Sequence, residues 1–179
     1  MKTIILITML SLTRICLSQE NMISKSGTIT FEASVASFEE VKATNNSVTF
    51  VLNPLTSEIA SLALIKGFRF KVALMEEHFN ENYIESDQYP KAIFKGKIDG
   101  FDVNGLNANP KNFIIKGTLT LHGKSRDINV SARISKSAAG IILVSDFSVN
   151  ASDFNILIPS IVKNKVSNKI NIRIAAVLK

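Results

Sequence analysis

The two histidines are the residues of this sequence best suited to acid–base chemistry or metal binding, and they lie far apart in the chain. His78 stands beside Glu77 in an acidic stretch, and His122 lies between an alternating segment and Gly123. A protein metal site needs three or four ligands at matched spacing, and the sequence has one cysteine and no His/Cys cluster. We therefore expect no metal site, and we expect His122 to be solvated at the end of a strand.

Motifs for catalysis are missing from the sequence. Glu76 and Glu77 are adjacent in a helical stretch, so their carboxylates point apart and do not form an acid–base pair. The chain has no nucleophile-elbow motif, no glycine-rich phosphate loop and no dinucleotide-binding fingerprint. We expect a protein that is not an enzyme and that uses no cofactor.

A row of basic residues, Lys91, Lys95 and Lys97, could attract phosphate together with Arg69 and Lys71. On a strand, such a row is usually the solvated outer face, where it also discourages edge-to-edge aggregation. No basic stripe is interleaved with exposed aromatic residues, so the sequence does not predict a nucleic-acid partner.

Phenylalanine supplies nearly all of the aromatic side chains, with 11 Phe, two Tyr and no Trp. Most of the phenylalanines alternate with polar residues, which places them on the inner faces of strands: Phe31, Phe50, Phe68, Phe70, Phe94 and Phe147. Met75, Phe79 and Tyr83 recur at intervals of four, on one face of a helix. A cavity lined in this way suits an alkyl or isoprenoid chain, and the same residues also suit an ordinary filled core.

The clearest element that positions these residues is a hairpin at 113–134. Phe113, Ile115, Leu119 and Leu121 occupy one face of its first arm, and Ile128, Val130, Ala132 and Ile134 occupy one face of its second arm. Alternation with one apolar face is typical of a half-buried antiparallel strand. Residues 123–127, which are polar and contain Gly123, are predicted to form the turn.

Six further segments alternate or are apolar enough to be strands: 27–35, 48–52, 68–72, 91–99, 141–152 and 170–178. Residues 39–47 are predicted to form a turn, and residues 54–62 a short helix or connector, because Leu55, Ile59 and Leu62 have helical spacing. Residues 73–89 are predicted to be helical up to Tyr89-Pro90. The regular alternation at 170–178 predicts a strand that pairs within a sheet and not an unpaired C-terminal segment.

About eight strands at hairpin-like spacing predict an all-β fold, either a sandwich or an antiparallel barrel with one or two short helical inserts. Small residues on the inferred inner faces favour the barrel: Ala33, Ala92, Gly96, Gly117 and Ala132. In a barrel of this size such gaps leave room for one small ligand, or they merely fit the taper of a solid core. Periodicity supports both interpretations equally.

Residues 1–18 are typical of a secretory signal peptide. Lys2 precedes an apolar stretch at 4–12, and Cys16-Leu17-Ser18 resembles a cleavage site before Gln19. Removing this leader takes away the one cysteine, so no disulfide is expected, and it lowers the formal charge from +6 to +4 because Lys2 and Arg14 are its only charges. No later stretch has the ~20 apolar residues of a membrane helix. We expect residues 19–179 to form one periplasmic or secreted domain.

Three motifs are similar to those of the YceI-like family of lipid- or polyisoprenoid-binding proteins. They are Met75-x-x-His78-Phe79, then Tyr89-Pro90-x-x-x-Phe94, and Gly117-x-Leu119-x-Leu121-His122-Gly123. The resemblance covers nearly all of residues 19–179 and implies an extended, lipocalin-like β-barrel, periplasmic in bacteria, that encloses a long apolar ligand. The chain departs from the family pattern at Phe79-Asn80-Glu81-Asn82-Tyr83 and in the apolar run at 156–162.

These observations together predict an exported barrel that holds an isoprenoid or other long-chain lipid. We expect Arg69 or His78 at the rim to meet the head group, the helical segment to cover one mouth, and a set of apolar residues to line the cavity: Phe31, Phe50, Phe70, Met75, Phe79, Tyr83, Phe94, Ile98, Leu119 and Phe147. Two alternatives stay open: a ligand-free structural or stress-related barrel with a filled core, and an enzyme that acts on a lipid. A homodimer is also possible.

Overall fold

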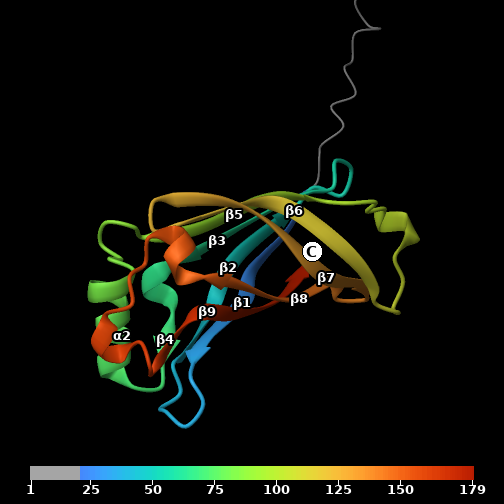
Figure 1. Ribbon diagram of the computed structural model, residues 1–179. Helices are drawn as coiled ribbons and strands as arrows, with labels where there is room; N and C mark the ends of the chain where they lie inside the picture. The colour runs from blue at the N-terminus through green and yellow to red at the C-terminus, as the bar shows by residue number, and fades with distance from the viewer. Residues whose placement is uncertain (1–20) are drawn as a thin grey trace, which may run out of the picture.

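Eight of the nine strands close an antiparallel barrel in the computed structural model, which describes residues 21–179 (Figure 1). The strands are β1 (Met22–Ser34), β2 (Lys42–Leu52), β3 (Glu58–Leu64), β4 (Arg69–Phe70), β5 (Lys91–Ile98), β6 (Lys111–Leu121), β7 (Lys124–Ser137), β8 (Gly140–Asn150) and β9 (Val166–Leu178). Their order is β1-β9-β8-β7-β6-β5-β3-β2, and the pairing of β1 with β2 closes the ring. The prediction of an all-β, lipocalin-like barrel is confirmed.

Strand β9 confirms that the regular C-terminal segment is paired, because it lies between β1 and β8. Its register with β8 brings Asp146 opposite Arg173 on the outer surface, where the two side chains form an ion pair of 2.7 Å. The hydrogen bond and the charge of Asp146 raise the pKa of the Arg173 guanidinium. Strand β4 pairs with β2 alone, so only two residues of the predicted strand at 68–72 join the sheet.

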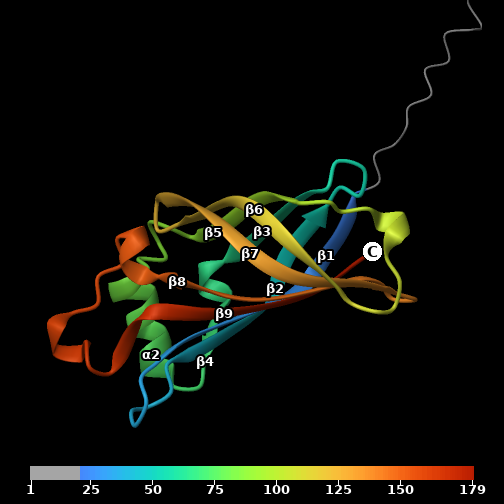
Figure 2. The same cartoon turned by 45° about the vertical axis from the view of Figure 1, so that its right-hand side comes forward.

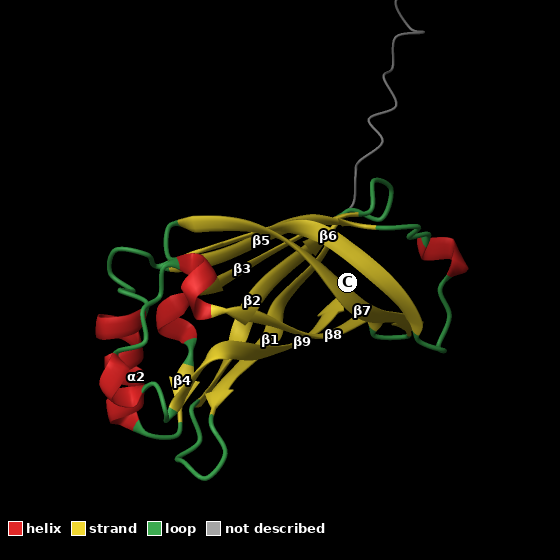
Figure 3. Cartoon of the chain, viewed as in Figure 1, coloured by secondary structure: helices red, strands yellow, loops and turns green. Residues whose placement is uncertain are grey.

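Short helices lie at the two ends of the barrel (Figure 3). Helix α2 (Ala73–His78) continues into a π-helical turn (Phe79–Tyr83), so the predicted helix at 73–89 is helical up to Tyr83 and continues as turns. Two 3₁₀ helices, Ala151–Phe154 and Ser160–Val162, lie at the same end as α2, and a third, Val103–Gly105, lies at the opposite end. A fourth 3₁₀ helix, Ile65–Gly67, follows β3.

The short helix or connector predicted at 54–62 holds only as a connection up to residue 57, because residues 58–64 form strand β3. This strand pairs with β2 on one side and β5 on the other, so its backbone hydrogen bonds are satisfied only within the sheet. Ile59 and Ala63 are buried on its inner face, whereas Leu55 lies in the connection before it and is exposed. Leu55 lies in the connection, and Ile59 and Leu62 lie in the strand. Their helical spacing in the sequence therefore does not correspond to a helix.

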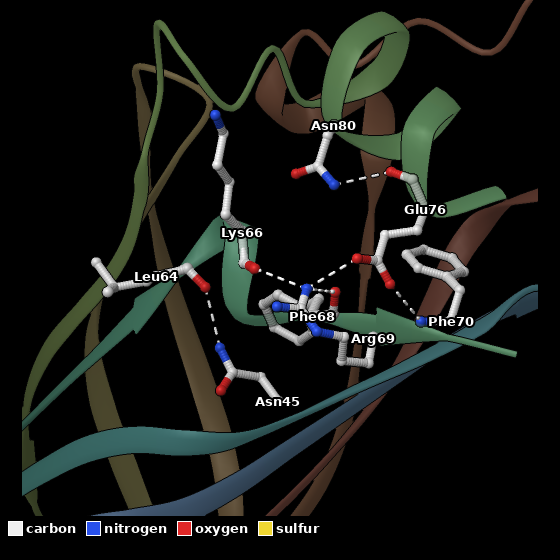
Figure 4. Close-up of polar contacts among 8 residues, drawn as sticks. All are labelled: Asn45, Leu64, Lys66, Phe68, Arg69, Phe70, Glu76 and Asn80. Atoms are coloured by element: carbon white, nitrogen blue, oxygen red, sulfur yellow. Dashed lines mark hydrogen bonds and ion pairs between the residues drawn. The ribbon is translucent and has the colours of Figure 1, made fainter. Parts of the chain in front are cut away.

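The turn predicted at 39–47 is shorter than expected, because β2 begins at Lys42. Asn45 is buried in the strand instead of capping a turn. Its Nδ2 donates to the carbonyl oxygen of Leu64 at 3.0 Å (Figure 4). Its Oδ1 accepts from the Ser47 amide at 2.9 Å. Satisfied side-chain hydrogen bonds allow a buried asparagine within a sheet.

The hairpin at 113–134 is confirmed, but its turn is tighter than predicted. His122 and Gly123 form a two-residue turn with φ values of 49° and 68°, and Lys124 already pairs with Leu121. Two left-handed residues match the twist of the flanking strands. The polar residues predicted as turn belong to β7, where Asp127 accepts a hydrogen bond of 2.6 Å from Thr118 across the pair.

Candidate ligand cavity

The interior of the barrel is filled at one end and hollow at the other. Along β7, Val130, Ala132 and Ile134 are buried, whereas Ile128 is only partly buried. Along β9, Ala176 and Leu178 are buried, whereas Ile170, Ile172 and Ile174 are not. An inward side chain that keeps accessible surface borders empty space. The hollow half faces α2, and the filled half faces the helix Val103–Gly105.

The hollow half contains a cavity of about 520 Å³. Its walls are mostly apolar side chains from the barrel strands, from the helical segment 73–83 and from residues 151–166. A few polar groups border it: Glu39, Ser61, His78, Tyr83, Ser145 and Lys165. Its volume falls within the ~300–1,000 Å³ of small-molecule sites, which are also largely apolar with few polar groups. Periodicity could not decide between a filled core and a cavity. The barrel has both, a filled core in one half and a cavity in the other.

Nine of the ten predicted lining residues border the cavity: Phe31, Phe50, Phe70, Met75, Phe79, Tyr83, Phe94, Leu119 and Phe147. The tenth, Ile98, points inward but is only 1% exposed and packs in the filled half. Its position follows from β5, which runs from the hollow end at Lys91 to the filled end at Ile98. Alternation predicted the face of Ile98 correctly, but it carries no information on depth along the barrel.

Of the two predicted rim residues, His78 borders the cavity and Arg69 does not. The Arg69 guanidinium instead lies outside, where Nη1 contacts Glu76 Oε1 at 2.8 Å and the carbonyl oxygen of Lys66 at 2.9 Å (Figure 4). Glu76 Oε2 also accepts from the Phe70 amide at 3.1 Å. Arg69 and Glu76 therefore attach α2 to β4, which positions the helical segment over the cavity.

Four phenylalanines hold the helical segment against the barrel from the inside. The ring of Phe79 lies 5.3 Å from Phe31 and 5.2 Å from Phe70, between ring centroids, and Phe31 lies 5.3 Å from Phe68. Tilted and edge-to-face contacts at these distances are favourable aromatic geometries. Phe79 is therefore both a wall of the cavity and the anchor of its cover.

The prediction of a solvated His122 is wrong, because its side chain is only 9% exposed. Nδ1 lies 3.0 Å from the carbonyl oxygen of Phe154, Nε2 lies 2.9 Å from Glu85 Oε2, and the ring packs edge-on against Tyr89 at 4.5 Å. Both polar partners are acceptors, so a ring that carries both protons donates to each of them. His122 thus joins three segments around the hollow end: the β6–β7 turn, the connection before β5 and the helix after β8.

The sequence analysis missed part of the cavity wall. Ile170, Ile172 and Ile174 of β9 line it, together with Ile156, Ile158 and Val162 from the connection between β8 and β9. The alternation of β9 was a usable signal for the first group. The second group lies in irregular backbone, where no periodicity marks an inward face.

Within residues 21–179, no group of three or more His, Cys, Asp or Glu side chains is placed to hold a metal ion. The helices of the same residues are all too short or too polar to cross a membrane.

A family model described as YceI-like domain matches residues 18–178 of the chain. A search of curated proteins found no match. Several solved structures have the same fold. A polyisoprenoid binding domain from Saccharophagus degradans, implicated in plant cell wall breakdown, superimposes with a TM-score of 0.78 at 14% identity and covers 89% of this chain and 97% of its own.

Two further structures are similar over most of their length. BcnA from Burkholderia cenocepacia has a TM-score of 0.69 at 14% identity, with 85% of this chain and 96% of its own covered. The YceI protein of Campylobacter jejuni has a TM-score of 0.64 at 20% identity, with 81% and 88% covered. At these identities the likeness is one of fold.

Proposed function

The chain belongs to the YceI-like domain family, and we propose that it is an exported, non-catalytic protein that binds one isoprenoid or other long-chain lipid in the hollow half of its barrel. The observation that carries this proposal is the apolar cavity of about 520 Å³ at one end of a closed barrel whose other end is filled. The polyisoprenoid-binding name of the structure from Saccharophagus degradans supports an isoprenoid among the long-chain ligands.

Apolar burial supplies the binding free energy in this proposal. Each methylene that leaves water contributes ~0.8 kcal/mol, so a long chain binds tightly without a precise polar site. The tail contacts Phe31, Phe94, Leu119 and Phe147 on the barrel wall, and Met75, Phe79 and Tyr83 cover it from the helical segment. The head group lies toward the mouth, near His78 and Lys165, which border the same cavity.

A binding role is favoured over catalysis by the groups inside the cavity. The buried hydroxyl of Ser145 donates to the backbone carbonyl of Ser131 at 2.7 Å, so it is engaged in the barrel wall. His122 and Glu85, the one histidine–carboxylate pair among residues 21–179, do not border the cavity. The proposed export, to the periplasm or the medium, rests on the leader sequence at 1–18, which lies outside the described residues.

Native mass spectrometry tests the proposal. The purified protein is incubated with geranylgeraniol, with palmitic acid or with glycerol, and organic extraction identifies any lipid that co-purifies. We expect one molecule of a long-chain probe to be retained and no glycerol. Retention of neither long-chain probe, with no co-purifying lipid, would favour the ligand-free structural barrel.

A matched pair of variants tests whether the ligand occupies the cavity. Ala92 borders the cavity, whereas Ala60 alternates with the inward residues Ile59 and Ser61 on β3 and faces outward. Ala92→Phe should therefore fill part of the cavity and weaken probe binding, and Ala60→Phe should leave it unchanged. Equal binding by the two variants would place the ligand elsewhere.

A further inference from the structure

The connection between β8 and β9 presents two exposed apolar side chains at the hollow end of the barrel, next to the cavity. In this connection, residues 155–165, the inner side chains Ile156, Ile158 and Val162 border the cavity. Leu157 and Ile161 point outward and are 80% and 83% exposed, the highest values among the large apolar residues of the described chain. Figure 2 shows this orange-red segment projecting from the barrel at the end that carries α2.

The charge of the same segment is entirely positive. It carries Lys163 and Lys165, both exposed, and contains no acidic residue. Neither lysine forms an ion pair with another described residue. Exposed aliphatic side chains followed by two lysines match the interfacial zone of a bilayer with anionic lipids, where apolar groups enter the acyl boundary and cations meet the head groups.

We propose that residues 155–165 dock the barrel onto the surface of a membrane that contains anionic lipids. Leu157 and Ile161 insert at the level of the acyl chains, Lys163 and Lys165 contact the head groups, and the cavity mouth faces the bilayer. This inference rests on the proposed function, because a lipid in the cavity has to enter from and leave to a membrane or another carrier. Docking at this end of the barrel lets the apolar tail of the lipid move between the bilayer and the cavity without exposure to bulk water.

A second copy of the chain is the competing occupant of this apolar patch. In a two-fold dimer the same patch meets itself, which would bring Lys163 and Lys165 of each copy together. Such like-charge contacts are unfavourable, whereas an anionic surface neutralises them. The charge of the segment therefore favours the membrane.

Vesicle flotation tests the docking. The purified protein is mixed with vesicles of phosphatidylcholine that contain about a third phosphatidylglycerol, and separately with pure phosphatidylcholine vesicles. We expect the double variant Leu157→Ser/Ile161→Ser to lower the partition coefficient by about tenfold or more. Leu55→Ser is the matched control, because Leu55 is 74% exposed but lies in the β2–β3 connection at the filled end. Lys163→Glu should weaken flotation with the anionic vesicles far more than with the neutral ones.

Three outcomes would overturn the docking proposal: no flotation of the unmodified protein, equal flotation of the double variant, or light scattering that shows a dimer converted by that variant to a monomer. Retention of geranylgeraniol, measured in the same samples without vesicles, separates this proposal from the previous one. Retention without flotation overturns the docking alone. If the unmodified protein does not retain geranylgeraniol, the lipid-binding function itself is overturned.

Discussion

The ring of Phe94 lies against Gly117 on the neighbouring strand, so closely that a Cβ atom on Gly117 would come within 2.6 Å of Phe94 Cζ. Gly117 pairs with Gly96, and the same ring atom would lie 2.8 Å from a Cβ there. Two opposed glycines thus form a depression in the inner wall, and the aromatic ring fills it. An aromatic ring over glycines is a recognised way to stabilise strand positions that lack side chains.

Gly117→Ala should destabilise the barrel and push Phe94 toward the cavity. The new methyl group would also lie 2.4 Å from the carbonyl oxygen of Lys95, which is part of the sheet and cannot move aside. We expect the free energy of unfolding to fall by about 1–3 kcal/mol, as for other overpacked sites. Gly105→Ala is the control, because no atom lies closer than 3.6 Å to a Cβ at that position, and a change within about 0.5 kcal/mol is expected there. Denaturant unfolding of both variants measures the difference.

Truncating an isoleucine should cost more stability in the filled half than in the hollow half. Ile134→Ala opens a new void in close-packed surroundings and should lower the free energy of unfolding by about 2–5 kcal/mol. Ile172 already borders empty space, so Ile172→Ala should cost less than half as much and should weaken binding of a long-chain probe instead. Unfolding curves with and without geranylgeraniol separate the two effects. Equal costs in the absence of probe would mean that the hollow half is filled in solution.

Phe79→Ala should loosen the cover of the cavity without unfolding the barrel. Its ring joins the helical segment to Phe31 and Phe70, and its loss leaves the contacts of Glu76 as the main attachment of α2. We expect faster hydrogen exchange at residues 73–83 and faster release of a bound probe. Leu74→Ala, on the exposed side of α2, should change neither rate. Unchanged exchange in the Phe79 variant would show that Glu76 alone holds the helix.

His122→Asn should weaken the junction of three segments at the hollow end. Asparagine tolerates the left-handed backbone of the turn, so this change removes the ring contacts while it preserves the turn. We expect the free energy of unfolding to fall by about 1–2 kcal/mol through the loss of partly buried hydrogen bonds. Exchange should also accelerate at residues 84–89 and 151–154, which contact the ring through Glu85, Tyr89 and Phe154.

Asp87→Asn is the control for this junction, because it removes an exposed ion pair with Lys66 and should have little effect on stability. Equal effects of the two variants would contradict the role assigned to His122.

The sequence by itself determined the class of fold and the inner face of nearly every strand. Alternation at 113–121, 128–134 and 170–178 predicted inward side chains correctly, because successive residues of a strand must point to opposite sides of a sheet. The same rule placed six of the expected residues on the cavity wall, and the four-residue spacing of Met75, Phe79 and Tyr83 placed three more. The family motifs at Tyr89, Phe94 and Gly117 pointed to the same barrel.

Only the tertiary structure decided how deep each residue lies and which segments pair. Ile98 and Phe94 share one face of β5, yet one is buried in the filled half and the other borders the cavity, because depth depends on the strands across the barrel. Residues 58–64 became a strand because β2 and β5 supply hydrogen bonds on both sides. His122 is enclosed by Glu85 and Phe154, 37 and 32 residues away. Local periodicity carries no information about partners so distant in the sequence. The depth of side chains, the pairing of residues 58–64 and the burial of His122 were therefore set by closure of the barrel.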